Sequence, residues 1–195
     1  MKKVLVIDDH EPSRRQLIQS LHGCGYQIAA EGSSGRVASA LARASAAEVI
    51  VMAVGLVDLD GIDAAREIMQ SDPLPIVLVT SHADPSTVAR ATNAGVMSYL
   101  VKPLRVEELA PAIELAVSRF REFVSLRDEV STLKLNLEER KLIERAKGLL
   151  MEQRHLSEER AYSLMKKASM NMRKPMSDIA QAILLAGGLL TDSNP

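Results

Sequence analysis

The sequence predicts an α/β domain with a five-stranded, doubly wound parallel sheet, followed by a C-terminal half made only of helices. Two observations lead to this prediction. In the first half, short apolar runs rich in β-branched residues alternate with segments of helical periodicity, as in right-handed β-α-β units. From Val106 onward no strand pattern occurs, and the apolar residues follow helical spacing instead. We therefore expect two structural parts with different architectures.

The composition is that of an ordinary globular protein: 195 residues, 47% hydrophobic and 25% charged. No apolar run approaches the roughly 18 residues of a membrane span, and Asp8 cuts the N-terminal apolar stretch too short for a signal peptide. The single cysteine, Cys24, excludes an internal disulfide and fits a reducing compartment. We expect a cytoplasmic protein that does not enter a membrane.

Five apolar segments predict the strands of the sheet. The first, Val4–Ile7, is short and β-branched, as expected for a parallel strand buried on both faces. Further strands are predicted at 27–32, 48–54, 75–80 and 96–101. The segments after the first four strands have helical periodicity and predict helices at 12–21, 35–44, 62–70 and 85–94.

The helical half starts with one pattern that runs from Val106 to about Gln153, which is long for a globular helix. A further helix is predicted from a Ser157 N-cap to about Met172. A last helix follows the break at 173–178 and is expected to end at Gly187-Gly188. Within the long helix, a 4-3-4 spacing typical of a coiled-coil seam relates Leu126, Val130, Leu133 and Leu137. Because the seam is short, an ordinary amphipathic helix explains it equally well.

Charge is distributed unevenly along the chain, although the net charge is −1. Up to residue 125 there are 12 basic and 15 acidic residues, and from residue 126 there are 12 basic and 10 acidic. Between Arg140 and Lys174 ten basic residues stand against four acidic ones. Such a patch is consistent with an anionic partner, although a solvated helix face is the simpler explanation of charge alone.

Polar residues follow the predicted strands at their carboxyl ends, where a doubly wound sheet forms its ligand crevice. Asp8 and Asp9 follow the first strand and offer the oxygen ligands that Mg²⁺ prefers. Thr80 ends the fourth strand and Lys102 follows the fifth, and their hydroxyl and ammonium groups suit a phosphoryl group. Ala53, at the end of the third strand, brings only a methyl group.

These residues resemble a bacterial response-regulator receiver domain. The matching pieces are Val4–Asp9, Asp60-Gly61, Val79–Ser81, Ala94-Gly95 and Tyr99–Pro103. The resemblance implies a flavodoxin-like receiver fold over 1–123, Mg²⁺ binding by the acidic pair, and a phosphoryl group read by Thr80 and Lys102. It also implies that Tyr99 stands at the switching aromatic position. The family's phospho-acceptor aspartate falls at Ala53, and Val57 replaces a proline that usually follows it.

An alanine cannot be phosphorylated, so we expect no aspartyl phosphate and no required cofactor. Without a third carboxylate, Asp8 and Asp9 form a weak Mg²⁺ site at best. Either one of the pair takes a raised pKa, or Lys102 pairs with them. Asp58 and Asp60 lie in the same loop as Ala53, but the resemblance implies that both point elsewhere. A substitute acceptor is therefore the minor alternative.

Residues 130–188 resemble an ANTAR domain, the RNA-binding module of transcription antitermination regulators. The matching runs are Leu142–Met151, Leu156–Tyr162, Leu164–Ala168 and Ile179-Ala180. The whole architecture is similar to the amidase-operon and nitrate-assimilation antiterminators. It predicts a receiver-like domain at 1–123, a helical linker at 124–139, an ANTAR domain at 130–188 whose first helix continues the linker, and a flexible tail at 189–195.

The ANTAR resemblance implies that exposed basic residues grip RNA hairpins near their loops. The candidates are Arg145, Lys147, Arg154, Lys166, Lys167, Arg173 and Lys174. The apolar stripe of the first ANTAR helix is formed by Ile143, Ala146, Leu149 and Leu150. Arg145 and Lys147 lie off this stripe and are expected to be exposed. Small residues at Ala146, Gly148 and Ala161 are expected to let helices approach closely. Tyr162 is expected in the core, with base stacking as its alternative.

The expected function is transcription antitermination by binding a two-hairpin element of a leader transcript, without enzyme activity. The expected partners are this RNA, a ligand-sensing regulatory protein that controls the non-phosphorylated receiver, and a second copy of the chain in a homodimer. Two alternatives remain. One is a phosphorylation-controlled regulator that uses another acceptor, and the other is a protein-interaction adaptor whose basic face never meets RNA.

Overall fold

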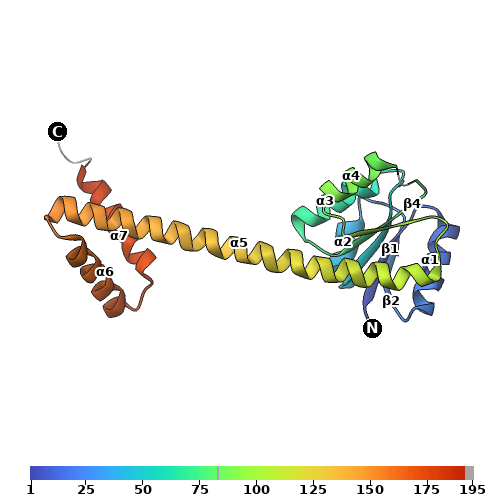
Figure 1. Cartoon of the computed structure of the whole chain (residues 1–195), viewed down its shortest axis with the longest axis horizontal. Coiled ribbons are helices and arrows are strands. Elements are labelled where there is room, and N and C mark those ends of the chain that lie inside the picture. Colours follow the sequence, from blue (N-terminus) through green and yellow to red (C-terminus); the bar gives the residue numbers. More distant parts are fainter. Residues whose placement is uncertain (83, 192–195) are drawn as a thin grey trace. The chain divides into compact units, whose positions relative to one another are not determined.

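The computed structural model describes residues 1–82 and 84–191, with side chains described as far as Ala186. The chain divides into two compact units, the first at Met1–Ser125 and the second beginning at Leu126. One helix, α5 (Val106–Arg154), contributes residues to both units. Figure 1 labels the helices and strands in chain order.

The first unit is a five-stranded parallel sheet with strand order β2-β1-β3-β4-β5. The strands are β1 (Lys3–Ile7), β2 (Gln27–Gly32), β3 (Val49–Ala53), β4 (Ile76–Thr80) and β5 (Ser98–Val101). The helices of this unit, besides α5, are α1 (Glu11–Gly23), α2 (Ala38–Ser45), α3 (Gly61–Ser71) and α4 (Pro85–Asn93). The predicted doubly wound α/β fold is confirmed.

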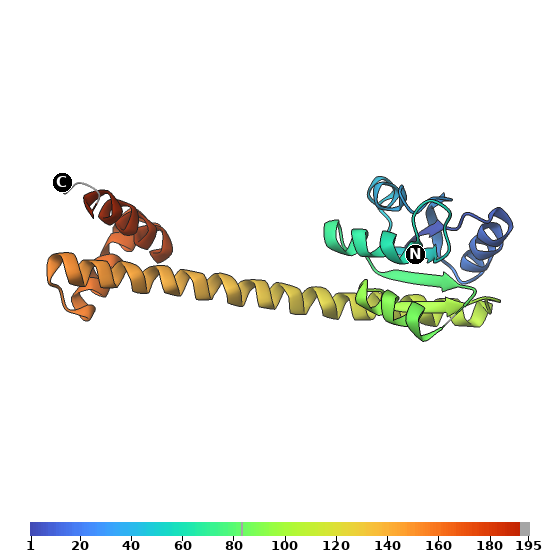
Figure 2. The ribbon, with the colours of Figure 1, turned by 90° about the horizontal axis from the view of Figure 1, so that it is seen from above.

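Helical connections between the parallel strands cover both faces of the sheet, and alternate residues of each strand point into one or the other of two cores. Leu5 and Ile7 of β1 pack into a core formed with α2, α3 and α4. Val4 and Val6 pack into the opposite core, formed with α1 and the first part of α5. Figures 1 and 2 show these two helical layers from two directions. A rigid sheet therefore holds the loops at the carboxyl ends of the strands.

The second unit is built from the C-terminal part of α5, α6 (Glu158–Met172) and α7 (Met176–Thr191). Its core consists of Ala146, Leu150, Ala161, Met165, Ile179 and Ala180. The hydroxyl of Ser157 accepts a hydrogen bond from the backbone N–H of Arg160 and caps α6, as the sequence predicts. The expected three-helix arrangement is confirmed.

The last helix is longer than predicted. The expected stop at Gly187-Gly188 is wrong, because α7 continues through both glycines to Thr191. Glycine costs a helix about 1 kcal/mol but does not break it as proline does. Three residues of the predicted flexible tail are thus helical, and the remaining four, 192–195, lie outside the described residues. Among the residues that the structure describes, no helix is both long and apolar enough to cross a membrane.

Candidate functional site: a receiver pocket and a basic helical surface

The carboxyl ends of β1, β3 and β5 border a hollow of about 500 Å³. Four of the residues singled out in the sequence line it: Asp8, Asp9, Ala53 and Lys102. Thr80 and Tyr99 do not join them and line a second, much smaller hollow instead. The structure thus gathers the acidic pair, Lys102 and Ala53, as expected from parallel strands that end at one edge.

Asp8 is the best-connected residue of this pocket, and its side chain is only 2% exposed. Its Oδ2 atom accepts hydrogen bonds from Lys102 Nζ at 2.9 Å and from Ser13 Oγ at 2.8 Å. Its Oδ1 atom accepts a third from the backbone N–H of His10, at 2.9 Å. Lys102 also donates to Ser13 Oγ, at 2.8 Å. Of the two outcomes expected for the acidic pair, the structure therefore shows the pairing with Lys102, but only for Asp8.

These contacts bear on the weak Mg²⁺ site expected at Asp8 and Asp9. A cation on Asp8 would compete with the ammonium group of Lys102 for the same carboxylate oxygen. In the described part of the chain, no cluster of three or more His, Cys, Asp or Glu residues could hold a metal. With Lys102 in this position, a Mg²⁺ ion bound to Asp8 would have to displace the ammonium group from Oδ2.

Ser13 completes the pocket network but was not singled out from the sequence. It lies in the first turn of α1, and its backbone N–H donates to Nδ1 of His10, the N-cap residue of that helix. The only signal in the sequence that could have identified Ser13 is its hydroxyl about one helical turn after the acidic pair. This signal is weak, because serine is common at helix starts for capping alone.

The loop after Ala53 turns back sharply on β3. The backbone N–H of Gly61 donates to the carbonyl of Val54 at 2.7 Å, and a Cβ at Gly61 would lie 2.0 Å from the carbonyl oxygen of Ala53. Only glycine fits this close approach. The Asp60-Gly61 pair of the receiver resemblance therefore has a structural reason that is independent of phosphorylation.

Asp58 is held by the loop before α2 and does not line the pocket. It accepts from Ser34 Oγ at 2.5 Å and from the backbone N–H groups of Gly35 and Arg36 at 3.0 and 3.4 Å. The bond from Ser34, helped by backbone donors, lowers the pKa of the Asp58 carboxyl to about 2. These contacts also keep residues 34–36 in a loop, and α2 begins at Ala38, later than predicted.

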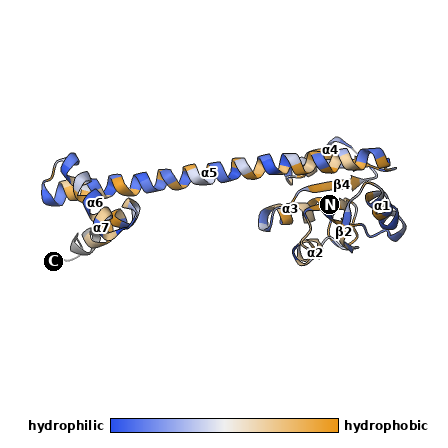
Figure 3. Ribbon diagram, turned by 90° about the horizontal axis from the view of Figure 1, so that it is seen from below, coloured by the Kyte–Doolittle hydropathy of each residue, from blue (hydrophilic) through white to orange (hydrophobic). Residues whose placement is uncertain are grey.

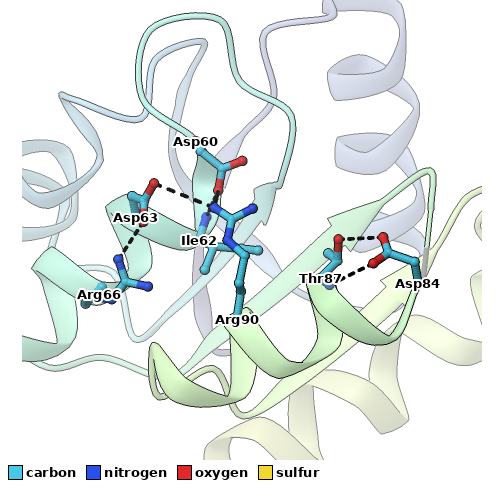
Figure 4. Close-up of polar contacts among 7 residues, drawn as sticks. All are labelled: Asp60, Ile62, Asp63, Arg66, Asp84, Thr87 and Arg90. Carbon is cyan, nitrogen blue, oxygen red and sulfur yellow. Dashed lines mark hydrogen bonds and ion pairs between the residues drawn. The ribbon is translucent and has the colours of Figure 1, made fainter.

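Asp60 is likewise engaged outside the pocket. Its Oδ1 atom caps α3 by accepting from the backbone N–H of Ile62 at 2.9 Å, and it accepts from Arg90 on α4 at 3.1 Å. Figure 4 shows Arg90 reaching between Asp60 and Asp63. Neither Asp58 nor Asp60 lines the hollow beside Lys102, which argues against a substitute acceptor.

Thr80 is nearly buried and is satisfied by its own loop. Its hydroxyl donates to the carbonyl of His82 at 2.7 Å and accepts from the backbone N–H of the same residue at 3.1 Å. The ring of Tyr99 is exposed on the β5 side of the sheet. Both residues occupy the strand positions expected from the sequence, but the Thr80 hydroxyl is already committed to a turn.

In the second unit, six of the seven candidate RNA-binding residues are exposed: Arg145, Arg154, Lys166, Lys167, Arg173 and Lys174. Lys147 is the exception, and its expected exposure is wrong because the residue is only 7% exposed. Its Nζ atom donates to Glu158 at 2.8 Å and lies 2.9 Å from Glu144. The bonds to Glu158 and Glu144 raise the pKa of Lys147.

The sequence pattern did not predict the burial of Lys147, and the reason is geometric. It follows the buried Ala146 on α5, and its long apolar stem can cross the helix interface while its ammonium group reaches the first turn of α6. The residue therefore joins two helices instead of facing solvent.

Two other expectations for this unit are wrong. Tyr162 is 47% exposed and does not fill the core, where the neighbouring Ala161 packs instead. Gly148 faces open space, with no atom within 4 Å of a Cβ built there, so it does not mediate a close helix contact. Ala146 and Ala161 do pack together with the core, as predicted.

The turn between α6 and α7 presents two of the basic residues. Arg173 ends α6 in the left-handed region, with φ 51°. The hydroxyl of Ser169 donates to the carbonyl of Lys174 at 2.5 Å, and the backbone carbonyl of Ser169 accepts from the backbone N–H of Lys174 at 3.1 Å. This double contact fixes the backbone from which Arg173 and Lys174 project.

Comparison with protein families matches both units. The "Response regulator receiver domain" model matches residues 4–114, and the "ANTAR domain" model matches residues 131–184. The transcriptional regulatory protein PdtaR of Mycobacterium tuberculosis is 41% identical over 192 residues, 98% of this chain and 94% of PdtaR. The DNA-binding transcriptional activator DevR/DosR of the same organism is 37% identical over 117 residues, which are 58% of this chain and 54% of the DevR/DosR chain.

Solved structures resemble the first unit. The receiver domain of a modulated diguanylate cyclase from Desulfovibrio desulfuricans G20 has a TM-score of 0.58 at 26% identity, covering 62% of this chain and 97% of that one. A LuxR-family response regulator from Aurantimonas sp. SI85-9A1 has a TM-score of 0.56 at 29% identity, and the match covers 60% of this chain and 84% of that one. The receiver match spans more than half of the chain and the likeness to PdtaR nearly all of it, so the protein belongs to the response-regulator family and carries a C-terminal ANTAR domain.

Proposed function

We propose that the protein is a cytoplasmic transcription antitermination regulator that binds hairpin RNA in leader transcripts. The observation that carries the proposal is the set of six exposed basic side chains on the ANTAR domain. Lysine and arginine groups bind RNA phosphates and release counterions, so the affinity should fall steeply with salt. Loop bases of the hairpins would supply specificity, and the exposed ring of Tyr162 is available for stacking.

Control by a partner protein, without phosphorylation, is the second part of the proposal. Ala53 provides no acceptor oxygen, and the two nearby aspartates are committed to loop contacts outside the pocket. Asp8 is satisfied by Lys102 within the chain. The receiver then serves as a docking domain for a ligand-sensing protein, which releases or withholds the RNA-binding unit.

RNA binding is tested with the purified full-length protein and a two-hairpin RNA from the leader of an operon adjacent to its gene. Fluorescence anisotropy over a range of salt concentrations measures affinity and its salt dependence. The Lys166→Ala/Lys167→Ala variant should bind more weakly and with a shallower salt dependence. Arg15→Ala is a matched control, because Arg15 is an exposed basic residue on α1 of the first unit. Salt-insensitive binding, or none, would favour the adaptor alternative.

Partner control is tested by adding the products of neighbouring genes one at a time to the same assay. A product that forms a complex with the chain and lowers its RNA affinity, reversibly with a small ligand, supports the proposal. If every neighbouring product leaves both the mass of the protein and its affinity unchanged, sequestration loses its support.

A further inference from the structure

The hollow at the carboxyl ends of the strands combines charged and apolar lining. Asp8, Asp9 and Lys102 supply the charges, and Ala53 and Val79 are among the apolar residues that line it. Figure 3 colours β4, the strand that contributes Val79, as hydrophobic. The volume of about 500 Å³ falls within the range of small-molecule sites, about 300–1,000 Å³. The hollow therefore has the size and the mixed lining that a small organic molecule requires.

Ala53 brings an apolar surface close to the acidic pair. It ends β3, which lies between β1 and β4 in the sheet, and it is paired in register with Val79 of β4. Both residues line the hollow. Neither a methyl nor an isopropyl group can form a hydrogen bond, so a purely polar occupant would leave them facing water. An occupant with an apolar part would cover them.

The charges around the hollow leave one carboxylate unbalanced. Lys102 is the only lysine or arginine among the described residues that line it, and its ammonium group is paired with Asp8 at 2.9 Å. Asp9 lines the same hollow and is half-buried. Among the ion pairs of the described residues, none includes Asp9. The hollow therefore carries an excess negative charge at Asp9.

Three kinds of occupant can be compared with this lining. An anion would meet the unbalanced carboxylate of Asp9, while Lys102 is already bonded to Asp8 and Ser13. A hydrated metal ion would pair with Asp9 but would leave the apolar lining in water. An organic cation satisfies both requirements, because its charged group balances the carboxylate and its hydrocarbon part covers the apolar residues.

We infer that the hollow binds a small organic cation, an alkylammonium or alkylguanidinium compound. Its charged group pairs with Asp9, and its hydrocarbon part lies against Ala53 and Val79. Gln16 and Ser81 also line the hollow, and their side-chain oxygens can accept further N–H groups of the ligand. The site gives the receiver a chemical input that requires no phosphoryl group. Binding needs neither RNA nor a partner protein, so failure of this inference would leave the proposed antitermination function standing.

Calorimetric titration of the purified full-length chain tests binding. The probes are n-butylammonium chloride and n-butylguanidinium chloride, at constant ionic strength. n-Butanol and n-butyrate are matched controls, since they carry the same hydrocarbon chain with no charge or a negative charge. At least one of the cations should bind saturably with one site per chain, and the controls should not bind. Equal binding of butanol, or no binding of either cation, overturns the inference, whatever Mg²⁺ does.

Asp9→Asn tests the charged contact. The substitution removes the charge but keeps the shape, and it should weaken binding of the cation by about tenfold or more, since a charge-assisted hydrogen bond is lost. Glu11→Gln is the matched control, because Glu11 is an exposed carboxylate in the first turn of α1 that pairs with Arg15 and does not line the hollow. It should leave the affinity unchanged. Equal losses for the two variants would reduce the effect to general attraction by an acidic surface and refute the site.

A ligand series on the wild-type chain tests the apolar contact without any risk of unfolding. From ethylammonium to propylammonium to butylammonium, each added methylene should raise the affinity by about two- to fourfold. Ala53→Leu should abolish this dependence, because the larger side chain fills the hollow and leaves every charge in place. Circular dichroism checks the fold of the variant. An affinity that is independent of chain length in the wild-type protein contradicts the inference.

Discussion

The ammonium group of Lys102 lies 2.9 Å from Oδ2 of Asp8, and it links the carboxyl end of β5 to that of β1 across the receiver pocket. Ser13 bonds to both groups and completes a three-residue network. Together with the backbone N–H of His10, these groups satisfy the buried carboxylate of Asp8 within the chain. Within the pocket, Asp8, Ser13 and Lys102 are therefore one another's partners.

Loading with a small phosphodonor in Mg²⁺ buffer should leave the wild-type mass unchanged. The Ala53→Asp variant should gain an adduct of about +80 Da, the mass of one phosphoryl group, because the new carboxylate would stand in the hollow lined by Asp8, Asp9 and Lys102. Intact-protein mass spectrometry reads this out. A wild-type adduct that disappears in Asp58→Asn or Asp60→Asn would show that one of these residues acts as a substitute acceptor.

Removing the lysine should destabilise the first unit and open Asp8 to metal. Lys102→Met leaves a buried carboxylate without its cation, at a cost of about 1–3 kcal/mol once the partial exposure of the lysine is taken into account. Urea unfolding measures this loss, and Mg²⁺ should raise the Tm of the variant more than that of the wild type.

Lys141→Met is the control for this experiment. Lys141 forms an exposed pair with Glu138 at 2.7 Å, and such pairs contribute less than about 1 kcal/mol. If both substitutions had equally small effects, the pairing of Lys102 with Asp8 would not be a stabilising contact.

Asp58 should make the first unit acid-sensitive. Its folded pKa of about 2 lies below the unfolded value of about 4. The carboxylate therefore stabilises the fold above about pH 4, and this contribution is lost as pH falls from about 4 toward 2. Asp58→Asn should lower stability at pH 7 and flatten the pH dependence in that window. An NMR titration of the Asp58 carboxyl with a midpoint near 4 would contradict the proposed contacts with Ser34 and Gly35.

Lys147 and Lys166 should respond differently to salt in RNA binding. Lys166 is exposed, so Lys166→Met should reduce the slope of log affinity against log salt by about one unit. Lys147 is bonded to Glu158 and Glu144, so Lys147→Met should destabilise the second unit and leave the slope unchanged. A loss of slope for Lys147→Met equal to that for Lys166→Met would mean that Lys147 leaves its partners to contact phosphate.

The fold and the pocket were largely predictable from the sequence, because both depend on local patterns. Buried parallel strands read as apolar runs, and their carboxyl ends bring Asp8, Ala53 and Lys102 together in any doubly wound sheet. The individual contacts were less predictable. The burial of Lys147 depends on where α6 packs against α5. Tyr162 is exposed because α6 turns the face that carries Ala161 toward the core. The spacing of residues along one helix predicts neither the burial of Lys147 nor the exposure of Tyr162.

The central claim is that RNA output does not require phosphorylation of the receiver. Its most direct test is the affinity of the purified wild-type chain for a two-hairpin leader RNA, measured at two salt concentrations with and without a phosphodonor. The account predicts salt-dependent binding that is the same in both cases, with no phosphoryl adduct on the protein. Binding that appears only after treatment with the phosphodonor, together with an adduct on the receiver, would contradict it.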